Sequence, residues 1–395
     1  MDEDLNQPLD FQNTQIAFSH RNDKNLKQLH SLFKAMNSPK LVKIGSAIAP
    51  TAIKLNLPFV KSIINKTIFN QFVGGYNLLD TQGNIDDLYR SNTMTILDFG
   101  AESKTTEEEL DRVMRENIKS VELAASNSCV PAISTKLTGL APNELLEKMQ
   151  TDVPLTESEQ REKAKFENRI DSICKRAYEL GAGVMIDAEE SWMQITMDRV
   201  VDDLMKEYNK EKVIVYNTYQ LYRIDKLDFL KESFEKAESD GYQLGAKLVR
   251  GAYMNKEREY ANENGLKDLI HKTRESTDKD FNAAIKFCVD NYKTMASVCA
   301  SHNETSNLYQ AKLIDERGIE KTHPHLNFSQ LFGMSDNITF NLARAGYNVA
   351  KYMPYGPLKE VIPYLIRRAN ENTSVTGDMS RELALIAKEI KRRGL

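Results

Sequence analysis

The sequence has only four cysteines among its 395 residues, and their spacing excludes two kinds of site. They lie far apart, with no C-x-x-C pair and no histidine at metal-ligand spacing, which disfavours both a zinc site and a disulfide framework. We therefore expect reduced thiols and a cytoplasmic protein. The four positions are Cys129, Cys174, Cys288 and Cys299.

Long apolar runs and an excess of basic charge are also missing. No run reaches the roughly 18 to 20 apolar residues that a membrane-spanning helix needs. The first residues, "MDEDLNQPLD", are acidic and polar, unlike a secretory signal or a mitochondrial transit peptide. With 53 basic and 57 acidic residues the formal charge is -4, so no global field attracts nucleic acid. We expect no nucleic-acid partner and a soluble or peripheral protein.

Several nucleotide-binding and hydrolase motifs are absent as well. The segment "GAGVMI" places Ile186 where the third glycine of G-x-G-x-x-G belongs, and no P-loop, H-E-x-x-H or G-x-S-x-G motif occurs. No metal site is predicted. A nucleotide cofactor, if the protein uses one, must be bound by a different structure from a Rossmann crevice or P-loop.

What the sequence does have is a regular alternation of short β-rich runs with longer helical segments. Eight such units over about 280 residues predict a closed, TIM-like (β/α)8 barrel. We place the barrel domain at 91–395 and an N-terminal helical arm at 1–90. The predicted strand regions are 93–103, 130–140, 183–191, 212–222, 245–253, 294–303, 325–333 and 348–356.

Each predicted strand ends in polar or ionisable residues. In a (β/α)8 barrel these ends share one face, where active sites form, so we expect a polar cup there. Taken singly, each residue has an ordinary structural explanation, such as capping a helix or forming a surface ion pair. The strand-end residues are Asp98, Lys136, Asp187, Glu189, Asn217, Arg250, His302, Asn303, Gln330 and Tyr352.

Residues 24–79 contain eight lysines and no acidic residue. Within them, apolar residues alternate with single lysines in an amphipathic pattern that Pro50 and Pro58 interrupt. We favour a helical arm that packs on the barrel with its lysines outward. The alternative is an interfacial helix that contacts an anionic membrane surface.

The last predicted strand leads into the segment "YMPYGPLKEVIPYLIRRANENTSV", 352–375, which contains two adjacent arginines. Tyr364 precedes Arg367 and Arg368 by three and four residues, so its ring shares a helix face with both guanidinium groups. Arginine binds a carboxylate through a planar donor fork. A small amphiphilic carboxylate is therefore a suitable ligand for this helix.

Four segments together resemble the proline dehydrogenase family. They are "IDAEES" at 186–191, "KLVRGAYMNKERE" at 247–259, "ASHNE" at 300–304 and the arginine segment above, and the resemblance extends from Phe11 to the C-terminus. It implies a distorted (β/α)8 barrel with non-covalently bound FAD, which oxidises L-proline to Δ1-pyrroline-5-carboxylate. The hydride would pass from proline C5 to flavin N5, and the electrons would go on to a quinone.

The resemblance also implies roles for residues around the substrate. Arg367 and Arg368 would bind the proline carboxylate, and Lys136 would add a third positive charge that Asp187 orients. Side chains that would wall the pocket, or lie close to the substrate, are Ala252, Tyr253, Leu331, Tyr352 and Tyr364. Because a tyrosine in the eighth-strand motif disfavours 4-hydroxyproline in this family, Tyr352 favours proline as substrate.

A second set of residues would hold the cofactor, according to the same resemblance. Lys247 would contact the isoalloxazine ring near N5, and Asn217 would bond the ring edge. The pyrophosphate would lie on Val249, Arg250 and Gly251. The residues expected around the rest of the flavin are Ser301, His302, Asn303, Gln330, Glu371 and Ser374.

Three alternatives stay open at this stage. One is a 4-hydroxyproline dehydrogenase, the second another flavin barrel such as a methylenetetrahydrofolate reductase, and the third a non-enzymatic lipid-binding or scaffold protein. Because no second catalytic domain is predicted, we expect a separate pyrroline-5-carboxylate dehydrogenase as metabolic partner.

Overall fold

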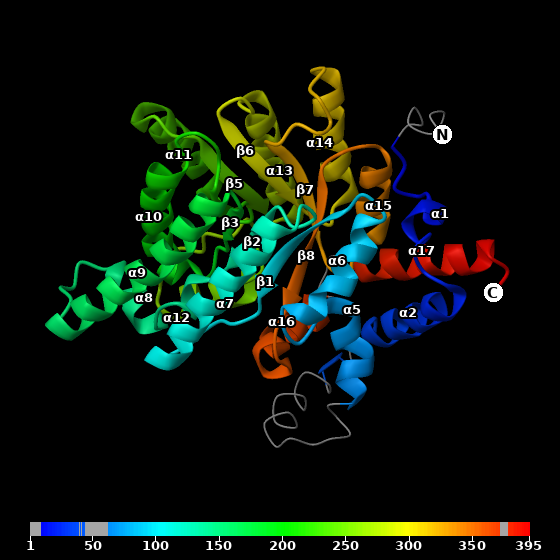
Figure 1. Ribbon diagram of the computed structural model, residues 1–395, viewed down its shortest axis with the longest axis horizontal. Coiled ribbons are helices and arrows are strands. Elements are labelled where there is room, and N and C mark those ends of the chain that lie inside the picture. The colour runs from blue at the N-terminus through cyan, green and yellow to red at the C-terminus, as the bar shows by residue number, and fades with distance from the viewer. Residues whose placement is uncertain (1–8, 39, 41, 44–61, 372–377) are drawn as a thin grey trace. The chain divides into compact units, whose positions relative to one another are not determined.

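The computed structural model of the protein describes residues 9–38, 40, 42–43, 62–371 and 378–395 (Figure 1). Its eight strands follow one another in chain order around a closed barrel, β1-β2-β3-β4-β5-β6-β7-β8. The predicted (β/α)8 fold is confirmed, and each strand lies within or next to its predicted region. The strands are β1 (Met94–Phe99), β2 (Ala132–Thr135), β3 (Gly183–Ile186), β4 (Val215–Gln220), β5 (Leu244–Val249), β6 (Met295–Ala300), β7 (Leu326–Leu331) and β8 (Val349–Tyr355).

The strand register decides which side chains share a face. Neighbouring strands pair in parallel, with Asp98 opposite Ser134, Ser134 opposite Met185, and Thr218 opposite Lys247. Since successive side chains along a strand point to opposite faces, residues level with one another on paired strands point the same way. Asp98 and Ser134 therefore share one face, and Thr218 and Lys247 likewise lie on a common face.

By their contacts, the residues divide into two compact units, one of Met1–Thr95 with Ser329–Leu395 and the other of Ile96–Phe328. The domain boundary predicted at residue 90 stays a prediction. In the second unit, α9 packs on β3 and α10 on β4, while α13 packs on both β5 and β6. The helices of this unit are α7 (Glu107–Ser126), η4 (Leu137–Gly139), α8 (Asn143–Met149), α9 (Glu157–Leu180), α10 (Ser191–Tyr208), α11 (Lys226–Asp240), α12 (Met254–Glu263), α13 (Arg274–Asp290) and α14 (Glu304–Glu316).

Local sequence explains where these helices begin and end. At the start of α9 the Thr156 hydroxyl accepts from the Glu159 main chain, and the Glu159 carboxylate accepts from the Thr156 main chain. This capping box satisfies two main-chain N–H groups that the helix leaves unpaired. The helix ends at Gly181, whose φ of 76° lies in the left-handed region that glycine tolerates best.

The first unit contains the N-terminal helices and the C-terminal part of the barrel. Its helices are α1 (Thr14–Ala17), α2 (Asp23–Met36), η2 (Asn65–Phe69), α5 (Asn70–Phe72), η3 (Leu79–Thr81), α6 (Gln82–Tyr89), α15 (Asp336–Arg344), α16 (Leu358–Glu371) and α17 (Asp378–Arg392). Within this unit α2 packs against α17, and α1 packs against both α15 and α17. None of the helices in the described ranges is both long enough and apolar enough to cross a membrane.

Helix α2 belongs to the lysine-rich arm. It buries Leu26, Leu29 and Phe33 in an apolar cluster that also contains Leu385 and Ile386 of α17. Its lysines are exposed, which is the arrangement of a packed amphipathic helix. The predicted interruptions at Pro50 and Pro58 lie outside the described residues.

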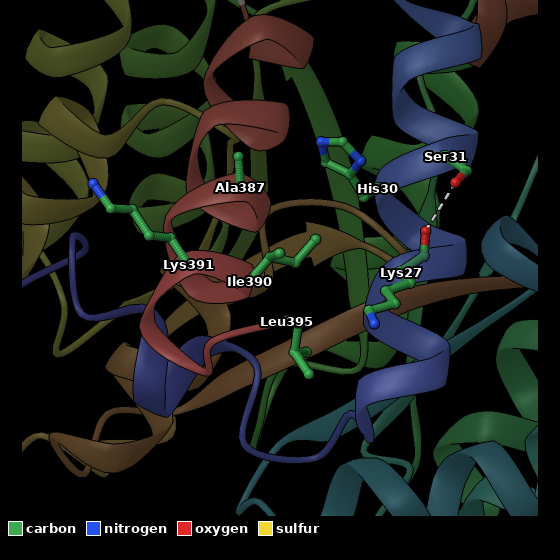
Figure 2. A pocket seen from close by; sticks show the side chains of 7 residues that line it. All are labelled: Lys27, His30, Ser31, Ala387, Ile390, Lys391 and Leu395. Carbon is green, nitrogen blue, oxygen red and sulfur yellow. Dashed lines mark hydrogen bonds between the residues drawn. The ribbon is translucent and has the colours of Figure 1, made fainter.

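A surface cavity of about 550 Å³ lies between α2 and α17 (Figure 2). Ala387, Ile390 and Leu395 form its apolar part, and Lys27 and Lys391 add positive charge. No residue that the sequence assigns to the substrate or cofactor lines this cavity, so the predicted site lies elsewhere.

Candidate active site

Four charged side chains from the ends of β1, β2, β3 and β5 meet in one buried cluster. The Lys136 ammonium lies 3.1 Å from Asp187 Oδ2 and 3.5 Å from Asp98 Oδ2. The Lys247 ammonium contacts the other oxygen of Asp187, Oδ1. Asp187 thus bridges the two lysines.

Asp187 is held by neutral groups as well. The Ser134 hydroxyl donates to Asp187 Oδ1 at 2.6 Å, and the Asp187 main-chain N–H donates to the Thr135 carbonyl at 2.9 Å. Burial alone would raise the pKa of Asp187, but the ammonium groups of Lys247 and Lys136, together with Ser134, lower it well below its usual range. The carboxylate therefore stays ionised at neutral pH, with both lysines beside it.

A second cluster surrounds Arg250, which directly follows β5. Its Nη1 donates to Ser301 Oγ at 2.6 Å, its Nη2 donates to Ser306 Oγ at 2.9 Å, and its Nε donates to Asp278 at 2.8 Å. Asn303 caps α14, since its side chain accepts from the Ser306 main chain. Five residues from three segments therefore gather around the first turn of a 13-residue helix, where main-chain N–H groups favour an anion.

This arrangement fits the pyrophosphate of a dinucleotide. An arginine and a helix N-terminus can both donate to phosphate oxygens. The Ser306 hydroxyl donates to Asn282 Oδ1 at 2.7 Å. The segment also needs glycine, because Gly251 has a φ of 134° and a Cβ there would lie 2.3 Å from the Tyr222 ring. Asp278 is the exception among these groups, since its carboxylate partly neutralises Arg250.

The predicted cofactor and substrate residues near Arg250 differ in how far they are exposed to solvent. Val249 and His302 are half-buried, and Ala252 is exposed. Tyr253 is buried at the start of α12, where the Lys256 ammonium lies 5.7 Å from the centre of its ring.

Asn217 does not share the strand face of Lys247. Its amide donates to Asp198 of α10 at 3.0 Å, and its amide oxygen accepts from the Thr218 main chain. Asn217 is level with Ala246, whereas its neighbour Thr218 is level with Lys247. Its side chain thus points to the α10 side of β4, away from the face of Lys247.

The other compact unit contains the remaining predicted residues. On α16 the Arg368 guanidinium lies 5.3 Å from the centre of the Tyr364 ring, and both side chains are buried. Arg367 is half-buried on the same helix. The face shared by the aromatic ring and Arg368 is therefore present in the structure.

Tyr352 and Gln330 lie in β8 and β7 of that unit, and both are buried. The Tyr352 carbonyl accepts from Phe332, next to the half-buried Leu331, and Gln330 Oε1 accepts from Thr339 at 2.8 Å. Glu371 lies in the last turn of α16, but its side chain and the whole of Ser374 are outside the described residues.

Sequence reasoning gave no role to several groups that the structure places in these clusters. Ser134 lies within a strand and Ser306 within a helix, and neither belongs to a recognisable motif. Asp278 lies on α13, 28 residues from Arg250 along the chain. Their positions depend on the register of the barrel, and no local pattern in the sequence could have identified them. No group of three potential metal ligands occurs in the part of the chain that the structure describes.

Comparison with known proteins now identifies the family. The family model for proline dehydrogenase matches residues 81–381. This chain belongs to the proline dehydrogenase family.

Individual relatives agree with that assignment. The chain is 33% identical over 374 residues to proline dehydrogenase 1, mitochondrial, of Dictyostelium discoideum. That match covers 84% of this chain and 65% of the relative. It is 38% identical over 241 residues to human proline dehydrogenase 1, mitochondrial, a match that covers 60% of this chain and 40% of the human protein. The chain thus spans less than two thirds of the length of either relative.

A solved structure shows the same fold. The chain superposes on proline utilization A of Bdellovibrio bacteriovorus with a TM-score of 0.74 at 19% identity. The superposition covers 93% of this chain and 42% of that one. This chain and the matched part of proline utilization A therefore share one fold.

Proposed function

We propose that this protein is an FAD-dependent dehydrogenase that oxidises L-proline to Δ1-pyrroline-5-carboxylate in proline catabolism. The observation that carries the proposal is the buried Lys136–Asp187–Lys247 cluster in a chain of the proline dehydrogenase family. As the hydride leaves proline C5, the nitrogen lone pair forms the C=N bond, and loss of the N–H proton to solvent gives the product. The chemistry that FAD supplies when bound is the acceptance of that hydride at N5.

The protein's own contribution is to hold the substrate. We propose that Arg367 and Arg368 bind the proline carboxylate, with Lys136 as a third cation. Arg368 is already buried against Tyr364, so its guanidinium loses little freedom when it binds an anion. Asp187 positions the Lys136 ammonium through the contact at 3.1 Å.

A pocket wall around the proline ring would exclude water and fix the orientation of the substrate. Positioning of this kind supplies much of the rate of a reaction between two bound partners. The residues proposed for this wall are Ala252, Tyr253, Leu331, Tyr352 and Tyr364. Tyr352 is proposed to favour proline over 4-hydroxyproline.

For the cofactor, we propose that Arg250 binds the pyrophosphate with the Val249–Gly251 main chain, and that Ser301, His302 and Asn303 hold the adenosine half. Lys247 would stabilise negative charge on the reduced ring, because a buried cation attracts that charge strongly. Gln330, Glu371 and Ser374 are proposed as further contacts. A role for Asn217 would require its amide to leave Asp198.

Electrons are proposed to leave to a quinone, and the product to pass to a separate pyrroline-5-carboxylate dehydrogenase. We place the protein in the cytoplasm, with peripheral membrane contact through residues 24–79 as the alternative to simple packing of the arm. No nucleic-acid partner is proposed.

A steady-state assay tests the function. We expect L-proline to support reduction of an artificial electron acceptor and to yield a cyclic imine, while NADH and D-proline give no reduction. Reduction by NADH alone would favour the methylenetetrahydrofolate reductase alternative. Faster turnover of 4-hydroxyproline than of proline would reassign the substrate while keeping the reaction class.

A further inference from the structure

Glu189 is a buried acid for which the proposed mechanism has no role so far. It lies three residues after the end of β3, only 3% exposed. Its Oε1 accepts from the Thr138 main-chain N–H at 3.1 Å, and its Oε2 accepts from the Thr138 hydroxyl at 2.6 Å. Both carboxyl oxygens therefore accept hydrogen bonds from Thr138, which lies two positions after Lys136.

Thr138 belongs to the short turn η4, which begins immediately after Lys136. On the other side of this turn, the Thr138 carbonyl accepts from the Lys104 main chain at 3.0 Å. The turn is also close-packed, since a Cβ on Gly139 would lie 2.9 Å from the Ala101 carbonyl oxygen. Glu189 and the segment after β1 therefore hold the turn from opposite sides.

The main chain of Glu189 is itself fixed. Its N–H donates to Gln194 Oε1 at 2.8 Å, and its carbonyl accepts from Gln220 Nε2 at 2.7 Å. Gln194 in turn donates to Asp198, which pairs with Lys226 at 2.6 Å. The carboxyl group that holds Thr138 is thus anchored to α10, β4 and α11.

Lys136 needs such support because its ammonium lies at the end of a long, flexible side chain. The ammonium has to stay within 3.1 Å of Asp187 and 3.5 Å of Asp98. Charge-assisted hydrogen bonds are only about 2.7 to 2.9 Å long, so a small displacement of the ammonium weakens its contact with a carboxylate. The direction of the Lys136 side chain depends on the conformation of its own main chain, and the turn η4 follows that main chain directly.

We infer that Glu189 is a positioning residue for the proposed reaction: by clamping Thr138 it fixes the turn after Lys136, and with it the point where the ammonium meets the substrate carboxylate. This inference rests on the proposed function, since it gives Lys136 the role of binding that carboxylate. Asp187 provides the negative charge beside the Lys136 ammonium, and Glu189 fixes the main-chain turn that follows Lys136.

The clamp does not require a charged carboxylate. Burial raises the pKa of Glu189 to about 8, with the neighbouring Glu190 acting in the same direction and Thr138 and Lys136 against it. The group is therefore mainly neutral at pH 7. A glutamine side chain has the same shape and can accept from the Thr138 N–H, so it can preserve the clamp where alanine cannot.

Four variants separate shape from charge and test both partners. Glu189→Ala and Thr138→Val remove clamp hydrogen bonds, whereas Glu189→Gln and Thr138→Ser keep them. Because Lys136 would bind the carboxylate in the ground state and the transition state alike, its misplacement acts mainly on KM. We expect at least about a tenfold higher KM for L-proline in the first pair, with kcat within about threefold of wild type, and values near wild type in the second pair.

A binding measurement without turnover complements the kinetics. Cyclopentanecarboxylate has the ring and carboxylate of proline but no nitrogen to form an imine, so calorimetry reports its binding alone. We expect the same tenfold loss of affinity in Glu189→Ala and Thr138→Val. Glu190→Ala is the matched control, because that neighbouring carboxylate faces the exposed Lys256 at 2.8 Å and not the turn. Its KM should stay at the wild-type value.

Two results would overturn the inference. If Glu189→Ala and Thr138→Val lower only the melting temperature and leave KM and affinity unchanged, Glu189 is merely structural. If Glu189→Gln loses as much activity as Glu189→Ala while Thr138→Val is normal, the group acts through its charge or proton instead. Failure of the proposed function is distinguishable from both, because wild-type protein would then not oxidise L-proline at all.

Discussion

Replacing Asp187 by asparagine should destabilise the protein strongly. In the structure the carboxylate touches both Lys136 and Lys247, whose side chains are 9% and 5% exposed. Asparagine keeps the shape but removes the charge that both ammonium groups face. Breaking a buried ion pair by removing one partner typically costs about 3 to 5 kcal/mol. We therefore expect the free energy of unfolding to fall by about that amount at pH 7.

The sign of the pH dependence follows from the lowered pKa of Asp187. A depressed carboxyl pKa contributes stability that is fully present above the ordinary value of 3.8 and is lost as the pH falls below it. The difference between wild type and Asp187→Asn should thus be constant from pH 5 to 7 and shrink in more acidic buffer. Urea unfolding followed by circular dichroism measures it.

Two further variants make this test specific. The double variant Asp187→Asn/Lys247→Met also removes the Lys247 ammonium. Its free energy of unfolding should be higher than that of Asp187→Asn alone, because only one buried cation then faces the neutral amide. Asp228→Asn is the matched control, since its side chain is 76% exposed beside Lys231, and exposed pairs contribute about 0 to 1 kcal/mol. An Asp187→Asn protein within about 1 kcal/mol of wild type would refute the reasoning.

Other predictions concern the substrate, the cofactor and pH. Arg368→Met should lower kcat/KM for L-proline by about 2 to 4 kcal/mol, the scale of losing a charged hydrogen-bond partner, and wild-type kinetics would return Arg368 to a structural role. Tyr352→Ser should admit 4-hydroxyproline in a steady-state assay, and unchanged selectivity would count against the assignment of Tyr352. Arg250→Gln should weaken FAD binding by about 1.5 to 3 kcal/mol but leave riboflavin affinity unchanged, as flavin fluorescence would show; equal losses for both ligands would contradict a pyrophosphate contact. The stability of Glu189→Gln relative to wild type should rise between pH 5 and 8, because ionising a buried carboxyl with a raised pKa costs stability as pH increases, and a flat difference would argue against that shift.

The fold could be predicted from the sequence because eight short β-rich runs alternate with longer helical segments. The resemblance to the proline dehydrogenase family implied that Asp187 orients Lys136, and the structure places the two side chains in contact. The contact of Asp187 with Lys247 did not follow, because it crosses from β3 to β5 and depends on the closure of the barrel.

The direction of the Asn217 side chain depends on strand parity, which a motif does not include. One residue along a strand reverses the direction of the side chain, so Asn217 points to Asp198 of α10 while Thr218 is level with Lys247. Ser306 and Asp278 were not predictable for a different reason. Helical residues outside any motif meet Arg250 only after α13 and α14 have packed.

The most direct test of the proposed function is an anaerobic visible absorption spectrum of the purified protein, before and after addition of L-proline. We predict flavin bands that bleach with L-proline and stay unchanged with NADH. Flavin bands that do not respond to proline would contradict the assigned substrate, and a colourless protein that FAD cannot reconstitute would contradict the flavoenzyme assignment as a whole.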